Sequence, residues 1–145
     1  GIEPQSLELE LTESAAIDHG PETSRRLDDL KALGVLLAID DFGTGYSTFA
    51  NLTRFPLDRL KVDKSLVEDI DRNDQRRAVV GTIIELCRQL GLSVTVEGVE
   101  RQSQLDAVRE LGCDEVQGFL FSPPLAPDAL ESYLRNGSAG GFVNR

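Results

Sequence analysis

The feature that most constrains this chain is the regular alternation of short apolar runs with longer amphipathic segments. Five runs have the length and composition of strands: Leu7–Leu11, Val35–Ile39, Leu60–Val62, Leu92–Val96 and Glu115–Phe121. Segments with helical spacing lie between them, at Ser24–Leu33, Gln75–Leu90 and Gln102–Leu111. Strands that alternate with helices are typical of β–α–β units around a parallel sheet. An α/β fold is therefore predicted.

Several of these predicted strands also alternate apolar and polar residues. The first run places Leu7, Leu9 and Leu11 on one face and Glu8 and Glu10 on the other, and the third and fourth runs follow the same pattern. Strands of a parallel sheet that is covered on both faces are apolar throughout. An antiparallel sheet with one face in water would alternate in the same way. The intervening helices instead favour a β/α barrel whose interior is polar near the carboxyl ends of its strands.

The length of the chain limits how much of such a barrel it can form. A (β/α)8 barrel takes about 250 residues and eight strands, whereas this chain has 145 residues. We therefore expect an incomplete TIM-like barrel of about five β/α units over residues 1–135. The absence of methionine indicates that Gly1 is not a native start, so the missing strands are expected on the N-terminal side. Residues 136–145 begin with NGSAGG and are typical of a flexible tail.

Composition narrows the possible partners and compartments. The net charge is −10 at pH 7, and no basic patch is evident, so binding to DNA or to nucleic acids in general is not expected. An anionic ligand would have to arrive with metal cations. The two cysteines, Cys87 and Cys113, fit neither a disulfide framework nor a zinc site, which indicates inert thiols in a reducing cytoplasm.

Polar residues stand at the end of every predicted strand: Glu10, Asp40 and Asp41, Lys61, Glu97 and Gln117. The carboxyl ends of barrel strands are where such folds place their chemistry. Two adjacent aspartates repel each other unless cations neutralise them, and hard divalent cations prefer carboxylate oxygens. An aspartate pair can equally cap a helix that begins near Ser47, so both interpretations of this pair stay open.

Three further features are less specific. Lys61 could orient a water molecule or stabilise charge on a phosphoryl oxygen, or it could form an interior ion pair with Asp63 or a neighbouring carboxylate. The Gly43–Gly45 loop could bring backbone N–H groups to a phosphate, but it matches neither phosphate-binding glycine motif. Asp69–Asp74 begins like a calcium loop but lacks the required glycine and final glutamate. A solvated loop is expected there.

Five motifs, taken together and in order, resemble the EAL family, the cyclic di-GMP phosphodiesterase domain of bacterial signalling proteins. They are LELELTES at Leu7–Ser14, DDFGTGYS at Asp40–Ser47, LKVD at Leu60–Asp63, VEGVE at Val96–Glu100 and QGFLFSPPL at Gln117–Leu125. The likeness runs from about Ser6 to Arg135. It implies the C-terminal part of an EAL-type barrel and a metal-dependent phosphodiesterase that hydrolyses cyclic di-GMP to the linear dinucleotide pGpG.

The resemblance also implies which residues bind metal. Glu10 and Asp40 would hold a first divalent cation, Mg²⁺ or Mn²⁺, and Asp40 would bridge to a second. Asp41 would hold that second cation, helped by Glu97 directly or through water. The glutamate of the EAL tripeptide and an asparagine ligand, both expected in this family, would lie before Gly1. We therefore expect this chain alone to be inactive.

The remaining implied roles concern the reaction and the substrate. Lys61 would position the attacking water or stabilise the transition state, with Asp63 as its neighbour, and Glu97 would take part in catalysis. Gln117 would contact the substrate or the water shell of the metal, and Glu100 would anchor the Gly43–Thr48 loop. The implied substrate-binding or loop-anchoring residues are Gln117, Glu100, Thr44 and Gly45.

A second function remains open, namely a catalytically inactive EAL-like module that binds cyclic di-GMP or a partner protein. The resemblance further implies a homodimer, and upstream regulatory domains such as GGDEF or sensor modules. It implies a cytoplasmic location, with membrane attachment of the full-length protein left open.

Overall fold

The computed structural model describes residues 1–12, 21–44 and 52–135. Its centre is a parallel sheet whose strands are neighbours in sequence order: β1 (Glu8–Thr12), β2 (Leu36–Phe42), β3 (Arg59–Val62), β4 (Ser93–Val96) and β5 (Glu115–Val116). A doubly wound sheet reverses its strand order at a switch point, whereas a β/α barrel does not. The order found here is that of a partial barrel, as predicted.

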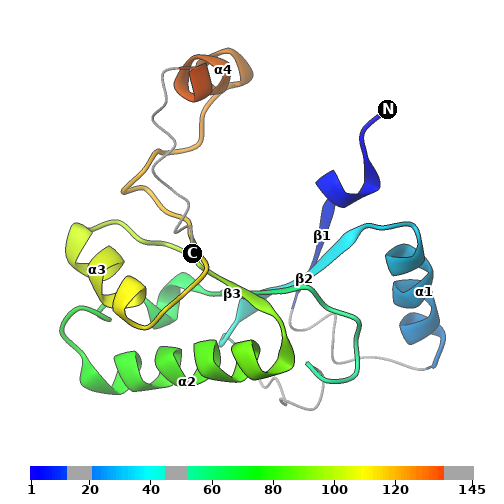
Figure 1. The fold of residues 1–145 in the computed structure, drawn as a ribbon. Coiled ribbons are helices and arrows are strands. Elements are labelled where there is room, and N and C mark those ends of the chain that lie inside the picture. The colour runs from blue at the N-terminus through cyan, green and yellow to red at the C-terminus, as the bar shows by residue number, and fades with distance from the viewer. Residues whose placement is uncertain (13–20, 45–51, 136–145) are drawn as a thin grey trace.

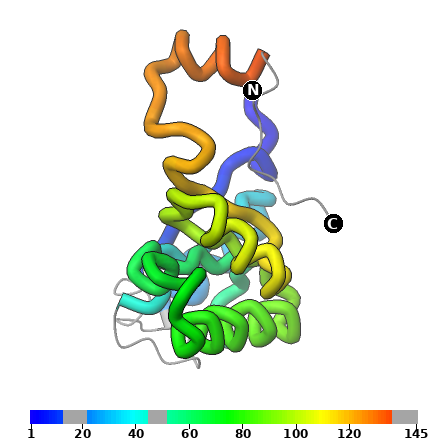
Figure 2. The backbone as a smooth tube through the Cα atoms, turned by 90° about the vertical axis from the view of Figure 1, so that its left-hand side faces the viewer, coloured from blue at the N-terminus to red at the C-terminus, as the bar shows by residue number. Residues whose placement is uncertain are grey.

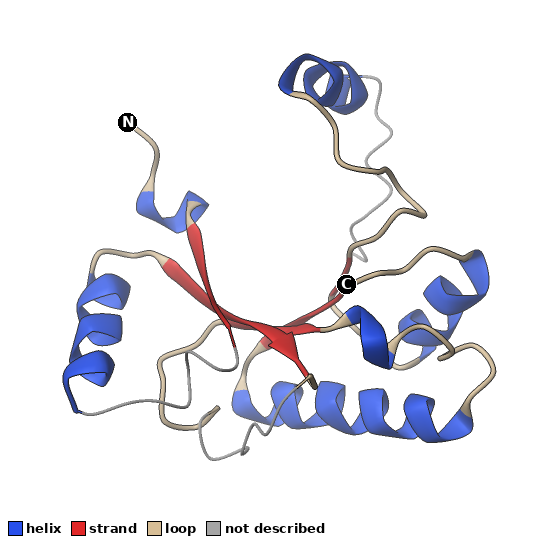
Figure 3. Cartoon of the chain, turned by 180° about the vertical axis from the view of Figure 1, so that it is seen from behind, coloured by secondary structure: helices blue, strands red, loops and turns tan. Residues whose placement is uncertain are grey.

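The helices are arranged in agreement with that order. They are α1 (Pro21–Ala32), α2 (Asp74–Leu90), α3 (Gln102–Glu110) and α4 (Pro127–Arg135), with short 3₁₀ helices η1 (Pro4–Ser6) and η2 (Lys64–Leu66). Figure 1 and Figure 3 show α1, α2 and α3 on one side of the curved sheet. Right-handed crossovers between successive strands place their helices on the same side when the strand order never reverses. The last helix, α4, reaches away from the sheet, as Figure 2 shows.

The hydrophobic core lies between the sheet and these helices. Strand residues that point to this side include Leu37, Ile39, Leu60, Val62, Val94 and Val96, and α2 contributes Val80, Ile83, Ile84 and Cys87. Asn73 caps the start of α2 by accepting from the backbone N–H groups of Gln75 and Arg76. Gly91 ends this helix in a left-handed conformation with φ 74°. Both ends of α2 are thus encoded locally.

The polar faces of the strands turn to the opposite, inner side, as the alternation predicted. At the amino half of the strands, Arg59 Nε donates to Glu8 at 2.8 Å and Arg59 Nη1 donates to Thr95 Oγ1 at 2.8 Å and to Glu115. One guanidinium therefore joins β1, β3, β4 and β5 through side chains. A second polar layer lies above it and forms the candidate site.

Two features of the C-terminal part differ from the sequence prediction. The fifth strand ends at Val116 and does not continue to Phe121. Gln117 donates its N–H to Val96 and accepts from Val99 N–H, after which Phe121 N–H turns back to Gly118 O. This bonding replaces the strand by a turn. Helix α4 was not predicted at all, and the predicted tail at 136–145 lies outside the described residues.

Both cysteines are buried and free, as expected. Burial raises the pKa of Cys87 and Cys113 to about 11, so both remain thiols at neutral pH. Among the helices of the described residues, none combines the length and the apolar character needed to cross a membrane.

The sheet edges lead to a first prediction. Within the described sheet β1 and β5 each pair on one side only, and Ile2 and Phe119 near these edges are 84% and 64% exposed. Unpaired strand edges and exposed apolar side chains promote association. We expect the purified 145-residue chain to self-associate, measured as molar mass by light scattering after size exclusion. A monomer mass independent of concentration would contradict this.

Candidate active site

Lys61 is the centre of a charged cluster at the carboxyl edge of the sheet. Its Nζ lies 2.7 Å from Glu10 Oε1, 3.1 Å from Asp40 Oδ1 and 2.8 Å from Glu97 Oε1. These carboxylates come from β1, from β2 and from the end of β4, while the lysine side chain is only 9% exposed. Parallel strands in register end at one edge, which is why residues so distant in sequence meet here. The structure thus brings together four of the predicted site residues.

The charges of the cluster shift the protonation of its members. Burial acts to lower the pKa of Lys61, but close contacts with the carboxylates of Glu10, Glu97 and Asp40 outweigh it and raise this pKa above its ordinary value. Burial raises the pKa of Glu97, and the nearby Lys61 offsets this only in part. Three carboxylates thus share one ammonium, and a further cation near them is electrostatically favourable.

One oxygen of Asp40 is buried in an ion pair but has no hydrogen bond within the described residues. Its Oδ1 is buried and accepts no hydrogen bond from the described residues, although Lys61 Nζ is 3.1 Å away. A buried polar atom without a hydrogen bond calls for an explanation, and oxygen donors of this kind suit Mg²⁺ or Mn²⁺. In the described ranges, however, no three acidic, histidine or cysteine side chains form a complete metal site. The donors fit a divalent cation, but this part of the chain does not complete its coordination.

A bulge explains how two adjacent aspartates can serve one region. Ile39 pairs with Leu60 but Phe42 pairs with Val62, so β2 holds one residue more than β3 over this interval. Asp41 lies in the bulge with φ 57°, the left-handed region that few residues other than glycine adopt. The extra residue breaks the strict alternation of side chains. Asp40 can therefore face Lys61 while Asp41 lines the adjacent cleft.

That cleft has a volume of about 660 Å³ and adjoins the cluster at the ends of β2, β3 and β4. Its lining includes Asp41, Asp63, Lys64, Glu97, Glu100, Gln117, Phe119 and Ser122. Five of the predicted site residues, namely Asp41, Asp63, Glu97, Glu100 and Gln117, therefore line one cavity. The lining is acidic because it contains four carboxylates, and Lys64 adds one positive charge.

Asp63 has a different local role from the one suggested by its position after Lys61. It caps η2, with its Oδ1 accepting from Ser65 N–H at 2.9 Å. Burial acts to raise the pKa of Asp63, but hydrogen bonds from Ser65 and Lys64 prevail and lower it. The described partners of Lys61 are Glu10, Asp40 and Glu97. The expected ion pair with a neighbouring carboxylate therefore forms, whereas the one with Asp63 does not.

Two glycines let the loops around the cleft approach one another. A Cβ on Gly98, which has φ 69°, would lie 2.3 Å from Lys64 Cβ. A Cβ on Gly118 would lie 2.0 Å from Val99 O. The loop that follows β4 is thus packed between the segment after β3 and the turn after β5. No larger residue fits either position without a shift of backbone.

The glycine-containing loop after β2 is described only in part. Thr44 Oγ1 donates to Asp41 O at 3.0 Å and so helps to hold the bulge. Gly45 lies outside the described residues, as do residues 46–48. The predicted anchoring of this loop by Glu100 therefore remains a prediction.

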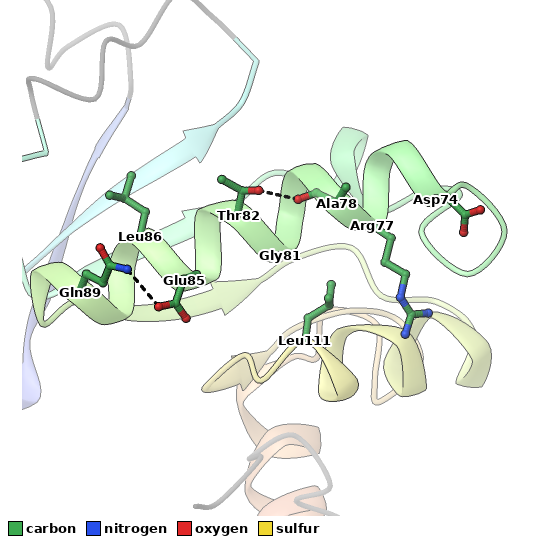
Figure 4. A pocket seen from close by; sticks show the side chains of 9 residues that line it. All are labelled: Asp74, Arg77, Ala78, Gly81, Thr82, Glu85, Leu86, Gln89 and Leu111. Carbon is green, nitrogen blue, oxygen red and sulfur yellow. Dashed lines mark hydrogen bonds between the residues drawn. The ribbon is translucent and has the colours of Figure 1, made fainter.

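A second groove of about 670 Å³ lies on the outer side of the molecule, along α2 and against Leu111. Figure 4 shows Thr82 bonded to Ala78 and Gln89 bonded to Glu85 within the helix. Arg77 pairs with Glu110. The titratable groups drawn do not converge on a common point, so this groove is not the candidate active site.

Comparison with known proteins agrees with this geometry. The family model described as the EAL domain matches residues 1–124. The chain belongs to the EAL domain family.

Individual relatives support the assignment. The cyclic di-GMP phosphodiesterase NbdA of Pseudomonas aeruginosa is 47% identical over 135 residues, which cover 93% of this chain and 17% of NbdA. The PaMucR phosphodiesterase, solved with cyclic di-GMP, has a TM-score of 0.82 and 39% identity, over 89% of this chain and 52% of that one. Klebsiella pneumoniae BlrP1, solved with cyclic di-GMP and manganese and also with calcium, has a TM-score of 0.80 and 39% identity, over 85% and 31% of the two chains.

The EAL chain contains a second polar layer, of which the motifs include only Glu8. Its members are Glu8, Arg59, Thr95 and Glu115. Each stands two residues before a strand-end residue of the candidate site: Glu10, Lys61, Glu97 and Gln117. The period-two pattern that predicted the polar face was the signal that could have found this layer.

The cluster gives a prediction for Lys61→Met in the full-length protein. Removing the ammonium leaves three carboxylates facing one another, which should lower the free energy of unfolding by about 3 kcal/mol, the lower end for a broken buried ion pair. Thermal unfolding measures this, with the exposed Lys64→Met as control. An unchanged melting temperature would contradict it.

The same variant should show an altered pH dependence of stability. The pKa of Glu97 is already raised and should rise further without Lys61. A carboxyl whose pKa is raised by folding stabilises the folded state at low pH and loses that contribution as pH rises through the raised pKa. The melting temperature of Lys61→Met should therefore lie further below that of the parent at pH 7 than at pH 5. An equal deficit at both values would contradict the shared-charge account.

Proposed function

We propose that the protein containing this chain is a metal-dependent phosphodiesterase that hydrolyses cyclic di-GMP to pGpG. The observation that carries the proposal is the convergence of Glu10, Asp40 and Glu97 on the buried Lys61 at the carboxyl edge of an EAL sheet. The relatives NbdA, a cyclic di-GMP phosphodiesterase, and PaMucR, a phosphodiesterase solved with cyclic di-GMP, support the substrate. Water adds across one P–O bond, so one phosphodiester becomes a phosphate monoester and a hydroxyl group.

The charge of the site fits an anionic substrate only when cations are present. Glu10, Asp40, Asp41 and Glu97 would hold Mg²⁺ or Mn²⁺, which when bound would lower the pKa of water and offset phosphate charge. The BlrP1 complexes with manganese and with calcium support a divalent cation. The choice of Mg²⁺ is supported only by the oxygen donors of these side chains.

Lys61 supplies the fixed positive charge of the site. Its raised pKa keeps it protonated at neutral pH, so it can donate hydrogen bonds to the attacking water or to a phosphoryl oxygen. Gln117 borders the same cleft and can hydrogen-bond to the bound dinucleotide, and Asp63 and Glu100 shape its wall. A homodimer, upstream GGDEF or sensor modules and a cytoplasmic location complete the proposal, on the basis of the EAL resemblance.

The second candidate function is a catalytically inactive module that binds cyclic di-GMP or a partner protein. The metal ligands that separate this module from an enzyme, a glutamate and an asparagine, are expected from the EAL resemblance before Gly1. The two functions differ in whether product forms, and the tests below separate them.

The aspartate pair gives the most direct test of the enzyme proposal. Asp40 has the buried oxygen without a hydrogen bond and Asp41 lines the cleft, so Asp40→Asn should reduce turnover further than Asp41→Asn. Each loss should reach about a hundredfold or more, the scale of a lost electrostatic stabiliser. The assay follows pGpG over time in the full-length protein, with Asp28→Asn on the exposed face of α1 as control.

The same assay tests the metal. Mg²⁺ or Mn²⁺ should support hydrolysis, whereas Ca²⁺, which is larger and less strict in geometry, should bind without equal catalysis. Hydrolysis that persists in chelator, or at the parental rate in Asp40→Asn, would refute the metal mechanism. Tight binding of cyclic di-GMP with no product under any metal would establish the binding module instead.

Lys61 allows a separate kinetic prediction. Well below the melting temperature of the variant, Lys61→Met should retain bound metal but lose turnover by about a hundredfold or more, because a charge on the reacting groups is lost. Metal binding is measured by calorimetry and turnover by product formation. Parental turnover combined with a lowered melting temperature would assign Lys61 to stability alone.

A further inference from the structure

Gln104 is a buried amide in the first turn of α3, and it lies outside the Lys61 cluster. It is 1% exposed. Its Oε1 accepts from the backbone N–H groups of Glu100 and Arg101, each at 2.9 Å. Its Nε2 donates to the backbone carbonyls of Val67 and Glu68, each at 3.1 Å. An amide has two donor hydrogens and two acceptor lone pairs, so its hydrogen-bonding capacity is fully used.

These four bonds join two segments that begin at the candidate site. Glu100 and Arg101 end the loop that starts at Glu97, immediately after β4. Val67 and Glu68 follow η2, which Asp63 caps, immediately after β3. We call Gln104 and its four backbone partners the Gln104 clamp. The clamp fixes the far ends of the two loops to each other.

Other contacts strengthen the same junction. Arg101 Nη2 donates to Glu68 O at 2.7 Å and to Asp71 Oδ1 at 2.9 Å. Ser103 Oγ donates to Asp71 Oδ2 at 2.8 Å, and the bonds from Ser103 and Arg101 lower the pKa of Asp71. The acidic segment predicted to be a solvated loop is therefore, at Asp71, part of this junction. Near the other end of the loop, Gly98 packs directly on Lys64.

A helix-capping role alone does not account for Gln104. A glutamine at the third position of a helix can return a hydrogen bond to the backbone at the helix start, which explains its bond to Arg101. Capping needs neither the bonds to Val67 and Glu68 nor complete burial. Those features are explained by a link between the loops.

We propose that Gln104 is a positioning residue for the reaction, because the clamp holds the Glu97 loop so that the Glu97 carboxylate stays at Lys61. This inference rests on the proposed function. Glu97 is tied to β3 by its own N–H, which donates to Val62 O at 3.0 Å, and its carboxylate lies 2.8 Å from Lys61 Nζ. Displacement of a reacting group by about 1 Å can cost about a hundredfold in rate. A clamp at the far end of the Glu97 loop can thus control turnover without contacting the substrate.

The test uses the full-length protein with Gln104→Met, which keeps the length of the side chain but makes none of the four bonds. Gln102→Met is the matched control, because Gln102 lies in the same turn, is exposed and bonds to Asp106 on its own helix. We expect Gln104→Met to lower kcat by about tenfold or more with little change in KM. Exchange of the Glu100 and Arg101 amide hydrogens should accelerate. The control should match the parent in both measurements.

A conservative variant separates the two roles of the amide. Gln104→Glu keeps the acceptor for Glu100 and Arg101 but replaces the donor that binds Val67 and Glu68. If the link between the loops matters, kcat should fall as in Gln104→Met, and recovery of the parental kcat would reduce Gln104 to a helix cap. If Gln104→Met does not fold, the kcat of Gln104→Glu is compared with that of the parent instead.

The remaining outcomes are equally decisive. Unchanged amide exchange in Gln104→Met overturns the clamp, and faster exchange with the parental kcat overturns the positioning role. If the parent hydrolyses no cyclic di-GMP, the proposed function fails. Crystal structures of the parent and Gln104→Met then decide the inference through the separation of Glu97 from Lys61. A retained separation overturns it, and a lengthened one supports it.

Discussion

The rest of the structure depends on one buried ammonium that is shared by carboxylates from β1, from β2 and from the end of β4. Lys61 contacts Glu10, Asp40 and Glu97 from the middle strand of the sheet. Neither side of this arrangement is stable alone, because a buried lysine requires counter-charges and three adjacent carboxylates require a cation. The register of β1 to β4 therefore aligns the charged side chains of these ion pairs as well as the apolar side chains of the core. The same charges leave an excess of negative potential at the edge of the sheet, which favours a cation there.

Much of this could be predicted from the sequence because it follows from periodicity and from strand ends. Alternation in Leu7–Leu11 shows that one face is polar, and helices between the strands show that the sheet is parallel. Strand-end residues such as Glu10, Lys61 and Glu97 must then lie at one edge. The EAL motifs strengthened this prediction but were not needed to place these side chains near each other.

What could not be predicted depends on contacts between segments. The bulge that turns Asp41 toward the cleft arises from the register of β2 against β3, which no local pattern encodes. The shortness of β5 follows from the bonds of Gln117 to Val96 and Val99. Gln104 looks like an ordinary polar residue of a helix start until its partners on another loop are known. In each case the deciding interaction joins residues that are far apart in the chain.

The backbone of Asp41 has a consequence for how such domains change over time. At φ 57°, asparagine and glycine are the residues that adopt this conformation with least strain. Each is one base change away from an aspartate codon. Under the proposed function, loss of this carboxylate would remove a metal ligand without adding backbone strain to the bulge. If the protein is the proposed enzyme, mutation can therefore silence hydrolysis at little cost to folding, which gives a short evolutionary route from an enzyme to a receptor.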